Sequence, residues 1–121
     1  MNNNRNIIWK YIDTEKASIK ALEDYQNMKK LQLILSTEAT RTSDPNSYRI
    51  QQNKEFLEWF EPSWNALEDE EKLILKEFYM TGNLKSGAGI RLQLKLNYSE
   101  RHLHRLRGDA IAKLSMMLFG K

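Results

Sequence analysis

The clearest structural pattern in the chain lies in residues 96–114, which read LNYSERHLHRLRGDAIAKL. Ser99 is a favoured residue for capping a helix N-terminus, and the apolar residues after it recur three and four positions apart. That spacing places one set of side chains on a single buried face: Leu103, Leu106, Ala110 and Leu114. Residues 96–114 therefore predict a turn followed by a well-defined helix that begins at Ser99.

The opposite face of this predicted helix is basic at its start and small further along. The residues that fall there, at about 100° per residue, are Arg101, Arg105, Gly108 and Ala112, with His102 and His104 beside them. Cations near a helix N-terminus gain nothing from the helix dipole, so the two arginines need another explanation. The major groove of DNA supplies one, because a guanidinium matches both guanine edges and phosphates. The alternative is a solvated helix face.

Positive charge is concentrated in the last third of the chain. The whole sequence of 121 residues has a formal net charge of only +3. Residues 1–80 carry 11 Lys and Arg against 14 Asp and Glu, a net of −3, whereas residues 81–121 carry 8 against 2, a net of +6. A one-sided basic surface is expected of a protein that neutralises phosphates and releases their counterions. The alternative is a solvated basic tail.

The composition excludes several classes of protein. A chain of 121 residues has the size of one typical domain, and 40% hydrophobic residues suffice for a modest core. The absence of cysteine excludes disulfides, thiolate zinc sites and cysteine nucleophiles. No apolar run approaches the ~18 residues of a membrane span, and the start, MNNNR, does not look like a signal peptide. We expect a soluble, cytosolic protein that does not enter a membrane.

The first part of the chain reads as helices separated by short breaks. Asp13 to Ser36 predicts one long helix, because apolar residues recur at helical spacing and neither Gly nor Pro interrupts it. Thr37 to Ser47 is a loop by composition, with Asp-Pro and Asn-Ser as turn residues. A second helix over about Tyr48 to Phe60 is followed by Pro62, which ends it or starts the next element. The apolar cluster at positions 7–12 is open in structure and role.

A third helix is predicted from about Ser63 or Ala66 to Met80, with acidic residues early, where they complement the helix dipole. The sequence Thr81-Gly82-Asn83 ends it, because glycine suits the left-handed position after a helix. Three aromatic residues precede or begin this helix, and in a small helical protein we expect them in the core rather than in a ligand pocket. They are Trp59, Phe60 and Trp64.

Two parts of the chain resemble a known DNA-binding module. Residues 67–79, LEDEEKLILKEFY, resemble the first helix of the helix-turn-helix in region four of bacterial sigma factors, and residues 96–114 resemble its turn and recognition helix. The whole layout is similar to the ArpU-like phage transcriptional regulators. The resemblance implies an all-α fold in two regions. Residues 1–62 form an N-terminal helical region for assembly or partner binding, with a long helix and shorter ones, and residues 63–121 form the helix-turn-helix module.

One segment carries two conflicting patterns. Residues 87–96, GAGIRLQLKL, occupy the place of the second helix of the module, yet Ile90, Leu92, Leu94 and Leu96 alternate as in a strand. Gln93 also stands where the family usually has a small residue. An isolated strand here has no convincing partner, so a helix is favoured. A strand would contradict the helix-turn-helix assignment.

The resemblance also implies which residues meet DNA. Ser99 caps the recognition helix and binds a phosphate near its N-terminus. The residues that reach base edges or the adjacent backbone are Glu100, Arg101, His104 and Arg105, and those that flank the phosphates from the turn are Lys95, Asn97 and Tyr98. Gly108 costs about 1 kcal/mol inside a helix. It either permits close approach of DNA or is a tolerated surface glycine.

These residues predict a sequence-specific DNA-binding transcriptional regulator of phage or prophage genes, late genes by the family resemblance. It inserts the helix from Ser99 into the major groove of double-stranded DNA and acts in the cytoplasm of a bacterial host, at the nucleoid. A single such helix reads few base pairs, so we expect the N-terminal helices to form a homodimer or to contact RNA polymerase. The alternatives are a phage DNA-packaging component, such as a small terminase subunit, and a protein-interaction module built on the helix from Asp13 to Ser36.

Catalysis finds little support in the sequence. His102 and His104 are two residues apart on a predicted helix and point to different sides, so they do not clamp one metal ion. The acidic run at 68–71 has no accompanying nucleophile, base or phosphate-binding loop. We therefore expect no enzymatic activity, no metal and no cofactor.

Overall fold

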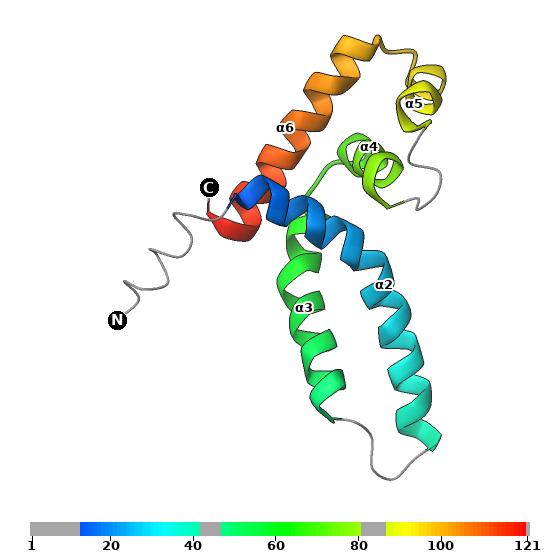
Figure 1. The fold of residues 1–121 in the computed structure, drawn as a ribbon, viewed down its shortest axis with the longest axis vertical. Helices are drawn as coiled ribbons and strands as arrows, with labels where there is room; N and C mark the ends of the chain where they lie inside the picture. Colours follow the sequence, from blue (N-terminus) through cyan, green and yellow to red (C-terminus); the bar gives the residue numbers. More distant parts are fainter. Residues whose placement is uncertain (1–12, 42–46, 81–86, 121) are drawn as a thin grey trace.

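The fold is all-α, as predicted. The structure is a computed structural model that describes residues 13–41, 47–80 and 87–120. Within these ranges it contains helices and no strand (Figure 1). The helices are α2 (Thr14–Arg41), α3 (Ser47–Asn65), α4 (Asp69–Tyr79), α5 (Ala88–Leu96) and α6 (Glu100–Phe119). The predicted apolar cluster at 7–12 and the turn Thr81-Gly82-Asn83 lie outside the described residues.

Helix α2 begins as predicted but ends later. The Asp13 carboxylate caps it by accepting a hydrogen bond from the Lys16 backbone N–H at 3.1 Å. The helix was expected to stop at Ser36, and the loop prediction for 37–41 is wrong, because α2 continues to Arg41. The predicted loop was also expected to include Ser47, which begins α3, and its positions 42–46 lie outside the described residues. Thr37 is accommodated in the helix by a hydrogen bond from its hydroxyl to the Leu33 carbonyl at 3.0 Å. Turn-forming composition did not outweigh propagation of a helix that contains neither Gly nor Pro over this stretch.

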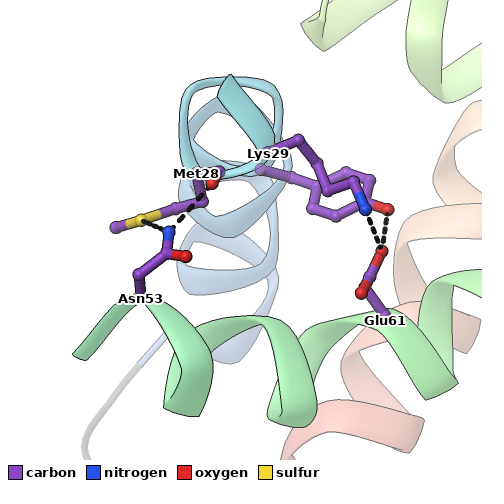
Figure 2. Close-up of polar contacts among 5 residues, drawn as sticks. Met28, Lys29, Asn53 and Glu61 are labelled. Carbon is purple, nitrogen blue, oxygen red and sulfur yellow. Dashed lines mark hydrogen bonds and ion pairs between the residues drawn. The ribbon is translucent and has the colours of Figure 1, made fainter. Parts of the chain in front are cut away.

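Helices α2 and α3 lie side by side as a hairpin-like arm (Figure 1). Polar contacts tie one helix to the other at two places along their length (Figure 2). The Tyr25 hydroxyl donates to Oε2 of Glu61 at 2.7 Å, and the Lys29 ammonium lies 3.2 Å from the same oxygen. Further along, the buried amide of Asn53 donates to the Met28 carbonyl at 2.8 Å. A directed hydrogen bond from a buried side chain fixes the position and the rotation of α3 relative to α2.

Helix α3 runs through its proline. The sequence predicted that Pro62 ends this helix or starts the next element, but α3 extends to Asn65 with Pro62 inside it. Pro62 is exposed and has no N–H to donate to the Glu58 carbonyl. Phe60 and Trp64 flank it and are 0% and 5% exposed. Keeping both rings in the core outweighs the cost of the proline.

Helix α4 starts later than predicted because a capping box fixes its first turn. The expected start at Ser63 or Ala66 is wrong, since α3 ends at Asn65 and α4 begins at Asp69. Glu71 accepts a hydrogen bond from the Glu68 backbone N–H at 2.8 Å, which satisfies a donor that would otherwise lack a partner. At the other end the Met80 N–H donates to the Lys76 carbonyl at 2.9 Å. The predicted end at Met80 is confirmed to within one residue.

A larger core joins the arm to the C-terminal helix. Aromatic rings dominate it, and Phe60 lies with its ring centroid 4.8 Å from that of Tyr25 and 6.2 Å from that of Trp64. Trp59 differs from the prediction: it is 40% exposed and packs at the edge against Phe119. The buried members of this core are Ala21, Leu22, Tyr25, Leu57, Phe60, Trp64, Leu67, Leu75, Ala110, Ile111 and Leu114.

A smaller core lies under α4, α5 and the first half of α6. Its buried members are Ile74, Leu92 and Leu103, one from each helix. Residues Ile74 and Leu75 are neighbours in α4, yet they belong to different cores. Helix α6 likewise contributes Leu103 to the smaller core and Leu114 to the larger one. The predicted division into regions 1–62 and 63–121 stays a prediction. Helix α6 contacts α2 and α3 from the first region as well as α4 and α5 from the second.

We predict that Phe60→Ala lowers the free energy of unfolding by about 3–5 kcal/mol, because it removes a fully buried ring and leaves a cavity among four aromatic neighbours. Chemical denaturation followed by circular dichroism measures this loss. The matched control is Met116→Ala on the exposed side of α6, where the side chain is 57% exposed, and it should change stability by no more than about 0.5 kcal/mol. Equal losses in the two variants would contradict the assigned core.

The contacts of Glu61 with Tyr25 and Lys29 predict a pH-dependent contribution to stability. The hydrogen bond from Tyr25 holds the pKa of Glu61 below its usual value, against the effect of partial burial, and Lys29 adds to the lowering. A carboxyl with a lowered pKa in the folded state stabilises the protein above the unfolded-state pKa, and the contribution is lost as the pH falls through the folded-state pKa. Glu61→Gln should therefore cost about 1 kcal/mol at neutral pH and almost nothing in acid.

Urea denaturation at a series of pH values checks this dependence. The control is Glu58→Gln on the same helix, whose carboxylate is exposed and lies 3.9 Å from Lys54. An exposed pair of this kind contributes little, so the control should show no comparable pH-dependent loss. A cost of Glu61→Gln that stays constant from neutral to acid pH would refute the electrostatic account.

Candidate nucleic-acid interface

Residues 88–96 form helix α5, so the expectation of a helix rather than a strand is confirmed. Leu92 is fully buried and Leu96 packs beside it, four residues on. The other two apolar residues, Ile90 and Leu94, are also four apart but are 67% and 82% exposed. The strand-like alternation therefore arises from two apolar pairs on different sides of one short helix.

Three residues join α5 to α6. Asn97 adopts the left-handed conformation with φ 58° and donates its N–H to the Gln93 carbonyl at 2.9 Å. Asparagine is one of the few residues besides glycine that adopt this conformation readily. Ser99 then caps α6 by accepting a hydrogen bond from the His102 N–H at 3.1 Å, as the sequence predicted. Lys95, expected in the turn, lies in the last turn of α5 and is exposed.

Tyr98 anchors this turn to the rest of the module. Its ring meets the His102 ring edge-on at 4.7 Å between centroids, and it packs against the smaller core. A hydrogen bond with Glu70 of α4 raises the pKa of the Tyr98 hydroxyl. These contacts fix the turn and so hold the N-terminus of α6 in place. Tyr98 therefore has a structural role that does not depend on a ligand.

The first two turns of α6 present the predicted reading face to solvent. Glu100, Arg101, His104 and Arg105 are all exposed. Arg101 has no hydrogen-bond or ionic partner among the residues that the structure describes. Nη2 of Arg105 lies 2.9 Å from Nδ1 of His102, which occupies one of its five N–H donors and leaves the others for a ligand.

Arg107 is a residue of this region that sequence reasoning missed. Its guanidinium carbon lies 4.5 Å from the centroid of the Phe78 ring, a cation–π contact between α6 and α4. Its Nη2 also lies 2.9 Å from Nδ1 of His104. The helical wheel places Arg107 toward the buried side, and only the position of α4 in space explains how a cation is held there.

Ion pairs narrow the basic surface to the turn and the start of α6. Arg91 pairs with Glu77 at 2.9 Å, and Lys113 pairs with Glu71 at 3.0 Å. Within the described part of the chain, Lys95 and Arg101 have no such carboxylate. Within residues 87–120, the positive charge without a carboxylate partner therefore lies at the turn between α5 and α6 and just beyond it.

Gly108 continues this exposed face. A methyl group added at its Cα would meet nothing within 4 Å in the described structure. Its φ is not in the left-handed region either, so no backbone conformation requires glycine. Packing within the chain therefore does not explain why the helix carries glycine at this position.

Comparison with known protein families, characterised proteins and solved structures found no match for the chain. The described residues contain no group of three or more His, Asp or Glu side chains that could hold a metal ion. His102 and His104 each face a different arginine. Within the same ranges, no helix is long and apolar enough to cross a membrane.

We predict that Gly108→Ala raises the free energy of unfolding by about 0.5–1 kcal/mol, because alanine favours a helix interior and its methyl group meets nothing here. Thermal and urea denaturation measure the gain. Gly120→Ala is the contrasting control, since Gly120 caps α6 with φ 81° and alanine is strained there. A loss of stability in Gly108→Ala would show that glycine is needed for folding.

Proposed function

We propose that this protein is a sequence-specific DNA-binding transcriptional regulator of phage or prophage genes, acting on late genes in the cytoplasm of a bacterial host. The observation that carries the proposal is the exposed cationic face at the N-terminal end of α6, which begins directly after a capped three-residue turn. The proposal assigns no catalytic activity. It places the first turns of α6 in the major groove of double-stranded DNA.

The geometry of the turn supports this proposal. Two helices joined by a short turn, with the second one exposed along its first turns, match the helix-turn-helix arrangement. Ser99 leaves the first N–H groups of α6 at the surface, where a phosphate oxygen is a suitable acceptor. Arg101 and Arg105 then lie one turn apart on the same exposed side of α6.

The distribution of charge supports it as well. The basic residues of the C-terminal third that have no carboxylate partner lie beside the turn, whereas residues 1–80 have a net charge of −3. Glu100 interrupts the basic surface. Such a carboxylate accepts from a cytosine amino group or disfavours wrong placements of the phosphate backbone, and both effects favour specificity over affinity.

The arm made by α2 and α3 supports an assembly role for the N-terminal region. It extends away from the C-terminal helices (Figure 1). Toward its far end Leu33, Ile34 and Tyr48 are 72%, 52% and 70% exposed. Large apolar side chains exposed together at one end of a helix pair are candidates for a contact surface. Within the proposal, this arm binds a second copy of the chain or RNA polymerase, which extends the few base pairs that one helix reads.

The same observation favours a second candidate, a protein-interaction module in which the arm is the functional part and α6 binds no DNA. Selection of bound sequences from a pool of random duplexes separates the two. A recovered consensus supports the regulator, and absence of any DNA binding even at low salt supports the interaction module. A ring-sized mass in light scattering, together with DNA binding, would instead indicate a packaging component.

We predict that Arg101→Ala weakens binding to the selected sequence by about 1–3 kcal/mol and, where Arg101 neutralises a phosphate, reduces the salt slope by about 1. Binding is measured by fluorescence anisotropy over a range of salt concentrations. The matched control is Lys30→Ala, which removes one exposed positive charge from α2. Equal effects of the two variants would contradict the proposed interface, provided that circular dichroism shows both to be folded.

A further inference from the structure

His104 is held by a single arginine. Among the described residues its only hydrogen-bond partner is Arg107, whose Nη2 lies 2.9 Å from Nδ1 of the imidazole. The two residues are three apart on α6, so the helix itself brings them together. His104 is exposed on the flank of the face that carries Arg101 and Arg105.

The chemistry of this contact fixes where the imidazole proton lies. A guanidinium has N–H donors and no acceptor, so Nδ1 of His104 must be the acceptor. In a neutral imidazole the proton is then on Nε2. Nε2 is also the ring nitrogen that Arg107 leaves available, and it is therefore a hydrogen-bond donor.

Arg107 is itself held in place from α4. The guanidinium lies over the Phe78 ring at 4.5 Å, and the side chain is half-buried. Both residues line a surface pocket of about 230 Å³, which Gly89 and Gln93 of α5 and His104 itself also line. An arginine stacked on a ring loses little freedom when it also donates to a neighbour, so it forms a rigid support for His104.

We propose that Arg107 is a positioning residue that fixes His104 as the Nε2–H tautomer, so that His104 presents a donor to acceptor-bearing base edges. This inference rests on the proposed function. In the major groove the acceptors are N7 and O6 of guanine, N7 of adenine and O4 of thymine, whereas cytosine presents only its amino donor. His104 therefore selects against cytosine on the strand it faces, while Arg107 touches no DNA.

The first experiment uses the free protein and needs no DNA. Long-range nitrogen–proton correlation spectra of the imidazoles, recorded at mildly alkaline pH where histidine is neutral, report which nitrogen carries the proton. We expect His104 to be protonated on Nε2 alone in the wild type and to become a mixture of tautomers in Arg107→Met. His102 is the internal control, because Arg105 holds it in the same way and should still do so.

Two results of this experiment would overturn the inference. One is a wild-type His104 that carries its proton on Nδ1. The other is a His104 tautomer that Arg107→Met leaves unchanged. Methionine keeps an apolar side chain beside Phe78, and circular dichroism verifies that the variant is folded. Phe78→Leu is a second variant, which keeps the Arg107 donor and should shift the tautomer less than Arg107→Met does.

The second experiment measures base preference. In selection from random duplexes, Arg107→Met should lose about fivefold or more of the discrimination against cytosine at one position, with the other positions and the salt slope unchanged. His104→Ala should affect the same position. Equal weakening at every position, or a smaller salt slope, would overturn the positioning role. A wild-type protein that selects no sequence would overturn the proposed function and the base-reading half of this inference, while the spectra decide the tautomer separately.

Discussion

The structure depends on the continuity of α6 through two hydrophobic cores. Its first half closes the small core under the turn, and its second half supplies Ala110, Ile111 and Leu114 to the large core with the arm. A helix that packs one side of each half into a different core cannot rotate at one core without disturbing the other, because side-chain packing in cores is close and specific. The packing of the second half of α6 in the larger core therefore helps to set the orientation of its exposed first turns.

The arginines along the start of α6 are of two kinds, those held by a histidine and one that is not. Two Arg–His contacts, Arg105 with His102 and Arg107 with His104, order side chains that are usually mobile at a helix surface. Arg101 has no such contact. Ordering reduces the entropy that a long side chain loses when it binds, but it also occupies a donor. The start of α6 therefore has two arginines held by histidines and one, Arg101, without such a contact.

Sequence patterns predicted those features that depend on residues close together in the chain. The start of α6 followed from its serine cap and apolar spacing, and the all-helical class followed from periodicity. Pro62 was misjudged because the burial of Phe60 and Trp64, which outweighs the proline, depends on α2 and α6. Arg107 was missed for a similar reason, since Phe78 reaches it from a helix 29 positions earlier in the chain. The candidate DNA contacts themselves remain predictions.

The two neighbouring residues Ile74 and Leu75, which serve opposite cores, restrict how this chain can evolve. Substitution of one apolar residue by another at either position disturbs a single core. Insertion or deletion of one residue earlier in α4 turns both side chains by about 100° and removes both from their cores together. Lineages that carry this fold should therefore vary in the length of the connections around α4 but keep the number of residues within it.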